Sequence, residues 1–344
     1  MKSTDLSFLV IGAGAIGGIT AAVMRKNGYD VGLLCRDEKL AAHISENGLK
    51  VKGFCGSFSI KIPVYSSVSQ INGKKDIILH ATKASDMGEA ARNSLKVLNE
   101  NGFFVSMQNG ICEDELGSVV GKDRVIGCVT GWGATMLPAG VLEMTSTGDF
   151  ILGYPGRTPD EFLEMVSEVL SVIVPAKTTA NIMGHLYSKL IINSCITSLG
   201  AISGIYLGKM LKIRKIRRIF IEIIREAVEL ADKMDIKIEV FGGRLDFKKF
   251  VLGNSIFSDF RRHLMIRIIG FKYKKLKSSS LQSLERGKPT EVDYFNGYIV
   301  KNSLQYGVNV PVNSAVVNMI HEIELKKRGI SIQNFNDPVF DKFN

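Results

Sequence analysis

The sequence predicts an N-terminal α/β domain with a doubly wound parallel sheet, followed by an all-α domain. Three observations lead to this prediction. An apolar strand pattern ends in a glycine-rich turn within the first 17 residues. Short apolar runs then alternate with helical patterns, as they do in βαβ units. From residue 182 the spacing of apolar residues changes to long helical stretches. We therefore expect domains at residues 1–180 and 181–344.

The elements of both domains can be assigned in chain order. Residues 6–11 predict a strand, 15–27 a helix and 30–34 a second strand. Further apolar runs predict strands at residues 58–62, 76–81, 102–107, 125–129, 141–144, 150–153 and 177–180, with helices at 85–99 and 161–172. In the second domain, helices are expected at residues 183–198, 213–234, 257–268, 278–306 and 312–327, and Gly329 should end the last one.

Length and composition limit the class of protein. The chain has 344 residues, of which 45% are hydrophobic, so it can bury a large core. No apolar stretch is long enough to span a membrane, and the first residues lead into the first strand without a signal peptide. The five cysteines are odd in number and widely spaced, and neither they nor the histidines show metal-ligand spacing. These features predict a cytoplasmic protein with reduced thiols, no metal and no membrane partner.

The net charge of +10 is concentrated in residues 209–218 and 261–277. Such a surface can bind nucleic acid or an anionic membrane, or it can be a solvated face that attracts an anionic cofactor and substrate. The basic residues alternate with Ile, Leu and Phe at helical spacing, without a zinc-finger, RRM or helix-turn-helix pattern. We favour the solvated face and expect no nucleic-acid partner.

The glycine-rich turn predicts a dinucleotide site. It reads Gly12-Ala13-Gly14-Ala15-Ile16-Gly17. The first glycine permits a tight turn, the second lets the backbone approach a pyrophosphate, and the third lets the helix pack against the strand. The helix that starts at Ala15 and Ile16 then offers free N–H groups to the phosphates. Because a strand precedes the turn and a helix follows it, we favour this site over a glycine-rich turn that binds nothing.

The end of the second strand indicates which dinucleotide binds. A site for NAD usually has Asp or Glu at this position, where it binds the ribose 2′-hydroxyl. This chain instead has Cys35 followed by Arg36, and a guanidinium suits the 2′-phosphate of NADP(H). Asp37 could still bind a hydroxyl, and Arg36 taken alone could be a solvated loop residue. We therefore predict NADPH/NADP as the cofactor.

Candidate catalytic residues lie in the second domain. Lys189, Asn193 and Thr197 are spaced i, i+4 and i+8, so they share one face of a helix that is otherwise rich in Leu and Ile. The lysine could donate a proton to a reduced carbonyl oxygen, or it could simply extend its charged end into solvent. Glu291 and Asp293 follow a Pro-Thr helix start and could meet Lys189, or only complement the helix dipole.

These motifs together resemble the ketopantoate reductase family over nearly the whole chain, in the same order and with similar spacing. The resemblance rests on residues 12–17, Arg36, residues 82–84 and 108–110, Lys189 with Asn193, Ser279, and residues 290–297. It implies a Rossmann domain joined to a helical domain of the 6-phosphogluconate dehydrogenase C-terminal type. It also implies reduction of 2-dehydropantoate to (R)-pantoate with NADPH, on the route to pantothenate and coenzyme A.

The resemblance also implies roles for single residues. Lys189 would be the general acid that protonates the ketone oxygen, and Glu291 would hold this lysine and a substrate hydroxyl beside the cofactor. Asn193 and Ser279 would bind the substrate. The residues implied to contact the cofactor are Gly12, Gly14, Ala15, Ile16, Gly17, Arg36, Lys83 and Glu291, with Asn109 at the junction of cofactor and substrate.

Two departures from the family pattern leave the 2-oxo acid open. The family often has a second asparagine where this chain has Thr197, whose shorter side chain would line the substrate pocket. Residues 236–277 are also longer and more basic than compact members need, and could cover the cleft, select another 2-oxo acid or join subunits of a homodimer. The alternatives are a reductase of a bulkier 2-oxo acid and an NADP-binding regulator without turnover, although a regulator would need neither Lys189 nor Glu291.

Overall fold

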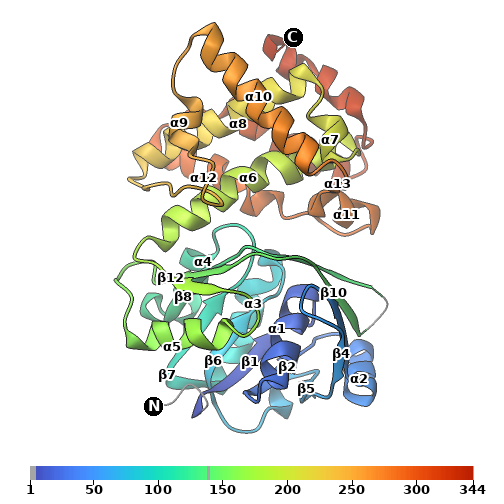
Figure 1. Cartoon of the computed structure of the whole chain (residues 1–344), viewed down its shortest axis with the longest axis vertical. Coiled ribbons are helices and arrows are strands. Elements are labelled where there is room, and N and C mark those ends of the chain that lie inside the picture. Colours follow the sequence, from blue (N-terminus) through green and yellow to red (C-terminus); the bar gives the residue numbers. More distant parts are fainter. Residues whose placement is uncertain (1–4, 138–139, 344) are drawn as a thin grey trace. The chain divides into compact units, whose positions relative to one another are not determined.

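The computed structural model describes residues 5–137 and 140–343 and divides the chain into two compact units, with the division between Ile182 and Met183 (Figure 1). Residues 1–4, which we expected to lead into the first strand, lie outside the described residues. In the described part of the chain, no helix combines the length and the apolar character needed to cross a bilayer.

An eight-stranded sheet forms the centre of the first unit, in the order β12-β11-β8-β7-β6-β1-β2-β5. All strands from β8 to β5 in that order pair in parallel, whereas β11 is antiparallel to β8. The strand order reverses at β1, which lies between β2 and β6. The strands are β1 (Ser7–Ile11), β2 (Asp30–Leu34), β5 (Val64–Tyr65), β6 (Lys75–His80), β7 (Leu98–Ser106), β8 (Val125–Thr130), β11 (Phe150–Gly153) and β12 (Ala176–Thr178).

Helices cover both faces of this sheet. Of the connecting helices, α1 (Ala15–Lys26) contacts α5 (Glu161–Leu170), and α3 (Ala84–Ser94) contacts α4 (Glu113–Val120). Because crossovers between parallel strands are right-handed, the helix after β1 and those after β6 and β7 lie on opposite faces (Figure 1). α2 (Glu38–Asn47) packs beside β5. This arrangement confirms the predicted doubly wound α/β fold.

A second, four-stranded sheet packs on α1. Its order is β4 (Phe58–Ile60), β3 (Leu49–Gly53), β10 (Val141–Ser146) and β9 (Gly133–Met136). The strands expected near residues 58–62 and 141–144 therefore exist but belong to this sheet, and β3 and β9 were not predicted. The approach is close because Gly18 of α1 has no side chain: a Cβ there would lie 2.5 Å from Leu142 Cδ1.

The second unit is all-α, as predicted. Its central helix is α8, which contacts α9, α10, α12 and α13 and buries most of its apolar side chains. The helices are α6 (Ile182–Ser203), α7 (Leu207–Met210), α8 (Arg214–Lys233), α9 (Phe247–Val251), α10 (Ile256–Lys272), α11 (Ser279–Glu285), α12 (Asn296–Tyr306) and α13 (Pro311–Glu324).

Several predicted boundaries are wrong, and α6 continues to Ser203 where its end was predicted at residue 198. The single helix expected at 278–306 is divided into α11, a 3₁₀ turn at Val292–Tyr294 and α12, because Gly287 adopts a φ of +64° and Pro289 lacks an N–H. Gly329 does not cap the last helix, since α13 ends at Glu324. The helix expected at 85–99 ends at Ser94, because β7 begins at Leu98.

All five cysteines are free thiols, and all except Cys55 are buried. Burial raises the pKa of the Cys35 thiol and holds the pKa of Cys195 well above its usual range. Uncharged buried thiols pack as small apolar side chains.

Candidate functional site

Four parallel strands of the first unit end at one level. Ile11 at the end of β1 is in register with Leu34 of β2 and with His80 of β6, and His80 is in register with Ser106 of β7. The ladder continues one residue further, since Gly12 N–H donates to the Leu34 carbonyl at 3.0 Å. The loops that follow these strands therefore start along one edge of the sheet, at its carboxyl ends, where open α/β sheets bind ligands.

The glycine turn after β1 fits a dinucleotide. Gly12 has a φ of +102°, and a Cβ there would lie 2.7 Å from the Ala81 carbonyl oxygen. A Cβ on Gly17 would lie 2.1 Å from the Gly12 oxygen, so this glycine is required for α1 to start against β1. Gly14 is exposed, and a Cβ there would meet nothing within 4 Å. Open space beside Gly14, at the positive end of α1, gives a phosphate room to approach the backbone.

Arg36 and Asp37 follow β2 at the same edge. The Arg36 side chain is 78% exposed and lies 3.4 Å from the carboxylate of Asp86. A pair this exposed contributes at most about 1 kcal/mol, so a phosphate can replace the carboxylate at little cost. Asp37 accepts the Leu40 N–H at 3.0 Å and caps α2. The carboxylate that could have bound a ribose hydroxyl is therefore already used to start a helix.

Lys83 and Asn109 lie in the loops after β6 and β7. Lys83 occupies the N-cap position of α3, so a second helix start adjoins this edge of the sheet. Asn109 comes three residues after the end of β7 and is half-buried. The first unit thus brings the glycine turn, Arg36, Lys83 and Asn109 to successive loops along one edge.

A chain of buried polar side chains connects these last two loops, and we did not predict it. The Ser106 hydroxyl donates to Gln108 Oε1 at 3.0 Å, and Gln108 Nε2 donates to His80 Nδ1 at 2.6 Å. Thr82 Oγ1 lies 3.2 Å from the same ring nitrogen and donates to the Lys83 carbonyl at 3.1 Å. Burial lowers the pKa of His80 to about 4, so the ring is neutral near pH 7.

Glu113 extends this chain at the start of α4. Its side chain is buried and accepts the Cys112 N–H at 2.9 Å. Burial raises the pKa of Glu113 to about 7, although hydrogen bonds from Ser106 and Cys112 favour the charged form. Ser106 has one hydroxyl proton and cannot donate it to both Gln108 and an ionised Glu113. A protonated Glu113 can donate to Ser106, so that Ser106 Oγ, Gln108 Oε1 and His80 Nδ1 each accept a hydrogen bond.

In the second unit, α6 carries three of the predicted residues. Lys189 and Asn193 are half-buried on it, while Thr197 is 8% exposed. The Thr197 hydroxyl donates to the Asn193 carbonyl at 2.6 Å. The hydroxyl proton of Thr197 is therefore used inside α6. A ligand can contact only the lone pairs of the hydroxyl oxygen and the methyl group.

Two other predicted residues lie on segments that α6 contacts. Ser279 is the exposed first residue of α11, and a Cβ on Gly200 of α6 would lie 2.6 Å from the hydroxyl of the preceding Ser278. Glu291 is half-buried at the start of the 3₁₀ turn Val292–Tyr294. The Thr290 N–H next to it donates to Glu324 of α13 at 2.7 Å.

A buried network fixes the segment after Glu291 to α6 and α8. Ser198 of α6 donates to Asn296 Oδ1, and Asn296 Nδ2 donates to Asn313 Oδ1 at 2.8 Å. Glu226 of α8 accepts the Asn313 amide at 2.7 Å and the Val312 N–H at the start of α13 at 2.8 Å. Glu226 could not be singled out from the sequence, because nothing in the pattern of α8 marks one of its acidic residues as buried.

The described residues contain no cluster of three or more His, Cys, Asp or Glu side chains placed to hold a metal ion. The first unit offers backbone N–H, guanidinium and ammonium groups, which suit an anionic cofactor. The second unit offers ammonium, amide and hydroxyl groups, which suit a carbonyl substrate, because a lysine can protonate or stabilise a developing alkoxide.

We expect Glu113 to make stability depend on pH. The pKa of Glu113 in the folded state is raised from 4.5 to about 7. Its contribution to the free energy of unfolding is therefore fully present below about pH 4.5 and is lost as the pH rises through 7. Glu113→Gln removes this titration. The unfolding free energy of the wild type relative to the variant should therefore fall by up to about 3 kcal/mol between pH 5 and pH 8, measured by urea unfolding.

Glu115→Gln is the matched control, since Glu115 is exposed on the same helix. The difference in unfolding free energy between Glu115→Gln and the wild type should stay constant between pH 5 and pH 8. A constant difference for Glu113→Gln as well would show that Glu113 is ionised throughout.

Two family models match the chain. "Ketopantoate reductase PanE/ApbA" covers residues 8–157, and "Ketopantoate reductase PanE/ApbA C terminal" covers residues 181–324. The chain is 26% identical to the 2-dehydropantoate 2-reductase of Aquifex aeolicus over 93% of its length and 97% of that protein. It is 28% identical to that of Pyrococcus horikoshii over 90% of its length and 94% of that protein.

The fold is also similar to a solved structure. The crystal structure of a PanE/ApbA family ketopantoate reductase from Ralstonia eutropha has a TM-score of 0.80 and 24% identity, with coverage of 93% of this chain and 99% of that one. The resemblance found in the sequence is thereby confirmed. The chain belongs to the ketopantoate reductase family, and it is a pyridine-nucleotide-dependent oxidoreductase that acts on CH–OH groups.

Proposed function

We propose that this chain reduces 2-dehydropantoate to (R)-pantoate with NADPH, a step towards pantothenate and coenzyme A. Membership of the family and the names of the relatives support this substrate. One structural observation contributes most: the glycine turn, Arg36, Lys83 and Asn109 follow four strands that end at one level. The free thiols suit a reducing compartment, and we place the enzyme in the cytoplasm.

The cofactor-binding residues have separate tasks in this proposal. When bound, the reduced nicotinamide supplies the hydride for the 2-oxo carbon. The turn from Gly12 to Gly17 and the N–H groups of Ala15 and Ile16 hold the pyrophosphate. Arg36 binds the 2′-phosphate and Lys83 a phosphate or ribose group, while Asn109 lies where cofactor and substrate meet.

Lys189 protonates the ketone oxygen as the hydride arrives at the carbon. Until it gives up this proton, its ammonium stabilises the negative charge that develops on the oxygen as the hydride adds to the carbon. Glu291 orients the ammonium and binds a substrate hydroxyl, and it lies against the cofactor. Asn193 and Ser279 bind the substrate, and Thr197 lines the same face of α6. Ser198 and the hydrogen bond from Thr290 to Glu324 hold these groups in place.

Replacement of Arg36 tests the choice of cofactor. Arg36→Ala should weaken NADPH binding by about 1.5–3 kcal/mol, the range for a charge-assisted hydrogen bond, and leave NADH binding nearly unchanged. Fluorescence titration of both cofactors measures this. Arg25→Ala is the control, because Arg25 is exposed at the far end of α1. Equal losses for NADPH and NADH would show that another group reads the 2′-phosphate.

Replacement of Lys189 and Glu291 tests the chemistry. Lys189→Ala should lower kcat for NADPH oxidation with 2-dehydropantoate by roughly 10²–10⁴, with little change in NADPH affinity. If Glu291 acts through Lys189, the double variant Lys189→Ala/Glu291→Ala should lose much less than the product of the single losses.

Lys209→Ala serves as the control, since Lys209 is an exposed lysine on α7. It should turn over like the wild type. Multiplicative losses would mean that the two residues act independently. A wild type that binds NADPH but reduces no 2-oxo acid would instead support a regulator.

A second candidate function is reduction of a bulkier 2-oxo acid. It is favoured by Thr197, which is shorter than asparagine and directs its hydroxyl to the Asn193 carbonyl. Under this alternative, Thr197→Asn should shift the ratio of kcat/KM towards 2-dehydropantoate over a bulkier acid by about 1–3 kcal/mol. Kinetics with both acids and both proteins test it. An unchanged ratio would place Thr197 outside the pocket and would favour 2-dehydropantoate as the substrate.

A further inference from the structure

Gln108 is a buried amide beside a predicted site residue. It is 4% exposed, and Asn109 follows it in the loop after β7. One residue earlier, the Met107 N–H donates to the His80 carbonyl at 3.0 Å, so the backbones that follow β6 and β7 are still paired there. The Gln108 side chain extends this pairing, because its Nε2 donates to His80 Nδ1 at 2.6 Å. A side chain thus continues the connection that the backbone of the two strands begins.

The Gln108 amide forms hydrogen bonds at both ends. Its oxygen accepts the Ser106 hydroxyl at 3.0 Å, while its nitrogen donates to His80. With Ser106 as a donor and His80 Nδ1 as an acceptor, turning the amide by 180° would oppose donor to donor and acceptor to acceptor. An unpaired polar group is costly when it is buried, so the amide keeps this one orientation.

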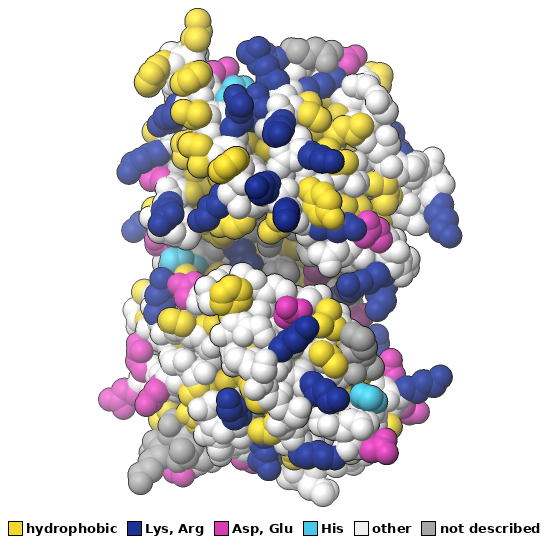
Figure 2. All heavy atoms as spheres, turned by 45° about the vertical axis from the view of Figure 1, so that its right-hand side comes forward, with side chains coloured by type: hydrophobic (Ala, Val, Ile, Leu, Met, Phe, Trp, Pro, Cys, Tyr) yellow, Lys and Arg dark blue, Asp and Glu magenta, His cyan; other side chains and the backbone are white. Residues whose placement is uncertain are grey.

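Glu113 connects the start of α4 to this amide through Ser106. Figure 2 shows the Lys, Arg, Asp and Glu side chains of one face spread over the surface of both units, where charged groups are normally solvated. Glu113 is instead 3% exposed, and its carboxyl bonds to Ser106 and to the Cys112 N–H. Gln108 is therefore held from two elements besides its own loop, namely the end of β6 and the start of α4.

The hydrogen bonds continue from His80 into the other loops of the candidate site. Thr82 Oγ1 lies 3.2 Å from His80 Nδ1 and donates to the Lys83 carbonyl at 3.1 Å. Between these residues, the Ala81 N–H donates to the Ile11 carbonyl at 2.8 Å, next to the glycine turn. A shift of His80 would therefore move both the residue that starts α3 and the backbone that contacts the glycine turn.

We propose that Gln108 is a positioning residue of this enzyme: its side-chain amide holds the loop that carries Asn109 against the loop that carries Lys83. The inference rests on the proposed function, in which Asn109 lies where cofactor and substrate meet and Lys83 binds a phosphate or ribose group. Hydride transfer needs the reacting atoms about 3–3.5 Å apart, so a displacement of about 1 Å at Asn109 is enough to slow it. Gln108 acts through these two loops and not by contact with the reacting atoms.

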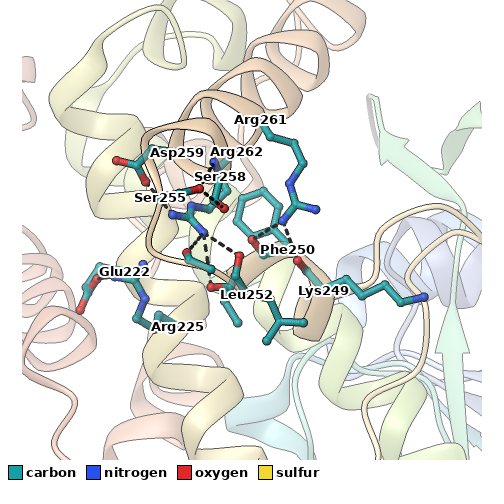
Figure 3. Close-up of polar contacts among 12 residues, drawn as sticks. Glu222, Arg225, Lys249, Phe250, Leu252, Ser255, Ser258, Asp259, Arg261 and Arg262 are labelled. Atoms are coloured by element: carbon teal, nitrogen blue, oxygen red, sulfur yellow. Dashed lines mark hydrogen bonds and ion pairs between the residues drawn. The ribbon is translucent and has the colours of Figure 1, made fainter.

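The second unit contains a buried connection of the same kind that serves as the comparison. Arg262 of α10 is 1% exposed and donates to the carbonyls of Val251, Leu252 and Gly253 at 2.9–3.3 Å (Figure 3). It holds the loop between α9 and α10, and none of the residues predicted for cofactor or substrate lies in that loop. Loss of Arg262 should therefore reduce stability alone, whereas loss of Gln108 should also slow the reaction.

Replacement of Gln108 by methionine tests the proposal, because methionine has a similar length and no amide. Gln108→Met should lower kcat for NADPH oxidation with 2-dehydropantoate about 10–100-fold and raise the dissociation constant of NADPH severalfold. The matched control Arg262→Met should lower the melting temperature and leave both values unchanged. A folded Gln108→Met enzyme with the kcat of the wild type overturns the proposal. An equal fall of kcat in both variants also overturns it, since loss of stability alone would then explain the effect.

The ring of His80 reports the contact itself. At pH 6, between the pKa of His80 at about 4 and that of Glu113 at about 7, the bond from Gln108 requires a neutral ring with its proton on Nε2. Long-range ¹H–¹⁵N spectra of histidine-labelled protein should show this tautomer, with His80→Asn as the assignment variant. The Nδ1 signal should shift in Gln108→Met and not in Arg262→Met. A proton on Nδ1, or an unchanged signal, overturns the proposal.

Thermal unfolding of each variant shows whether it is folded. If Gln108→Met is unfolded at the assay temperature, Ser106→Ala replaces it, because it removes the hydrogen bond to Gln108 Oε1 and little volume. It should lower kcat in the same direction, and a wild-type kcat would overturn the proposal. A wild type that reduces no 2-oxo acid contradicts the proposed function instead. The affinity for whichever of NADPH and NADH binds then decides: a raised dissociation constant in Gln108→Met supports the positioning role, and an unchanged one overturns it.

Discussion

The hydrogen-bond register that ends β1, β2, β6 and β7 at one level is the constraint on which the first unit depends. It brings the backbone of Gly12 against Ala81, at a distance that excludes any side chain at position 12. The same contact lets α1 start directly behind the strand, where Gly17 lies against the Gly12 carbonyl. A side chain at either glycine would separate β1 from its loop and move the helix start away from the edge where ligands bind.

Local signals were sufficient to predict much of this unit. An apolar run, three glycines and an amphipathic helix occur within one short stretch, so the turn and the first helix follow from neighbouring residues alone. The small sheet could not be predicted in the same way. β3 pairs with β10 across a long separation in the chain, and the half-exposed β9 shows little alternation. The packing of this sheet on α1 also involves Gly18, because a Cβ there would lie 2.5 Å from Leu142 Cδ1.

Some residues of the candidate site could also be predicted from local signals, whereas others could not. Arg36 and Lys189 stand out as charges at the end of a strand pattern or on an apolar helix, and the QNG sequence marks Asn109. The groups around them do not stand out. Glu113 is one of three consecutive acidic residues, and only the packing of α4 against α3 and β8 decides that it alone is buried. In the second unit, Ser198 connects with Asn296 and Glu226 with Asn313 over long separations, which helical periodicity cannot reveal.

The burial of the thiols determines which cysteine is oxidised first. Only a thiolate reacts quickly with peroxides and alkylating agents, and burial both suppresses the thiolate and blocks access to it. Cys195 combines complete burial with a strongly raised pKa, and Cys35, close to the glycine turn and Arg36, is protected in the same way. Burial raises the pKa of the Cys55 thiol as well, but Cys55 lies in the turn after β3 and is the one cysteine that is not buried, so reagents reach it more easily than the other four. Oxidative damage should therefore begin at Cys55, where a sulfenic acid changes the turn between β3 and β4 and not the turn at Gly12 or the end of β2.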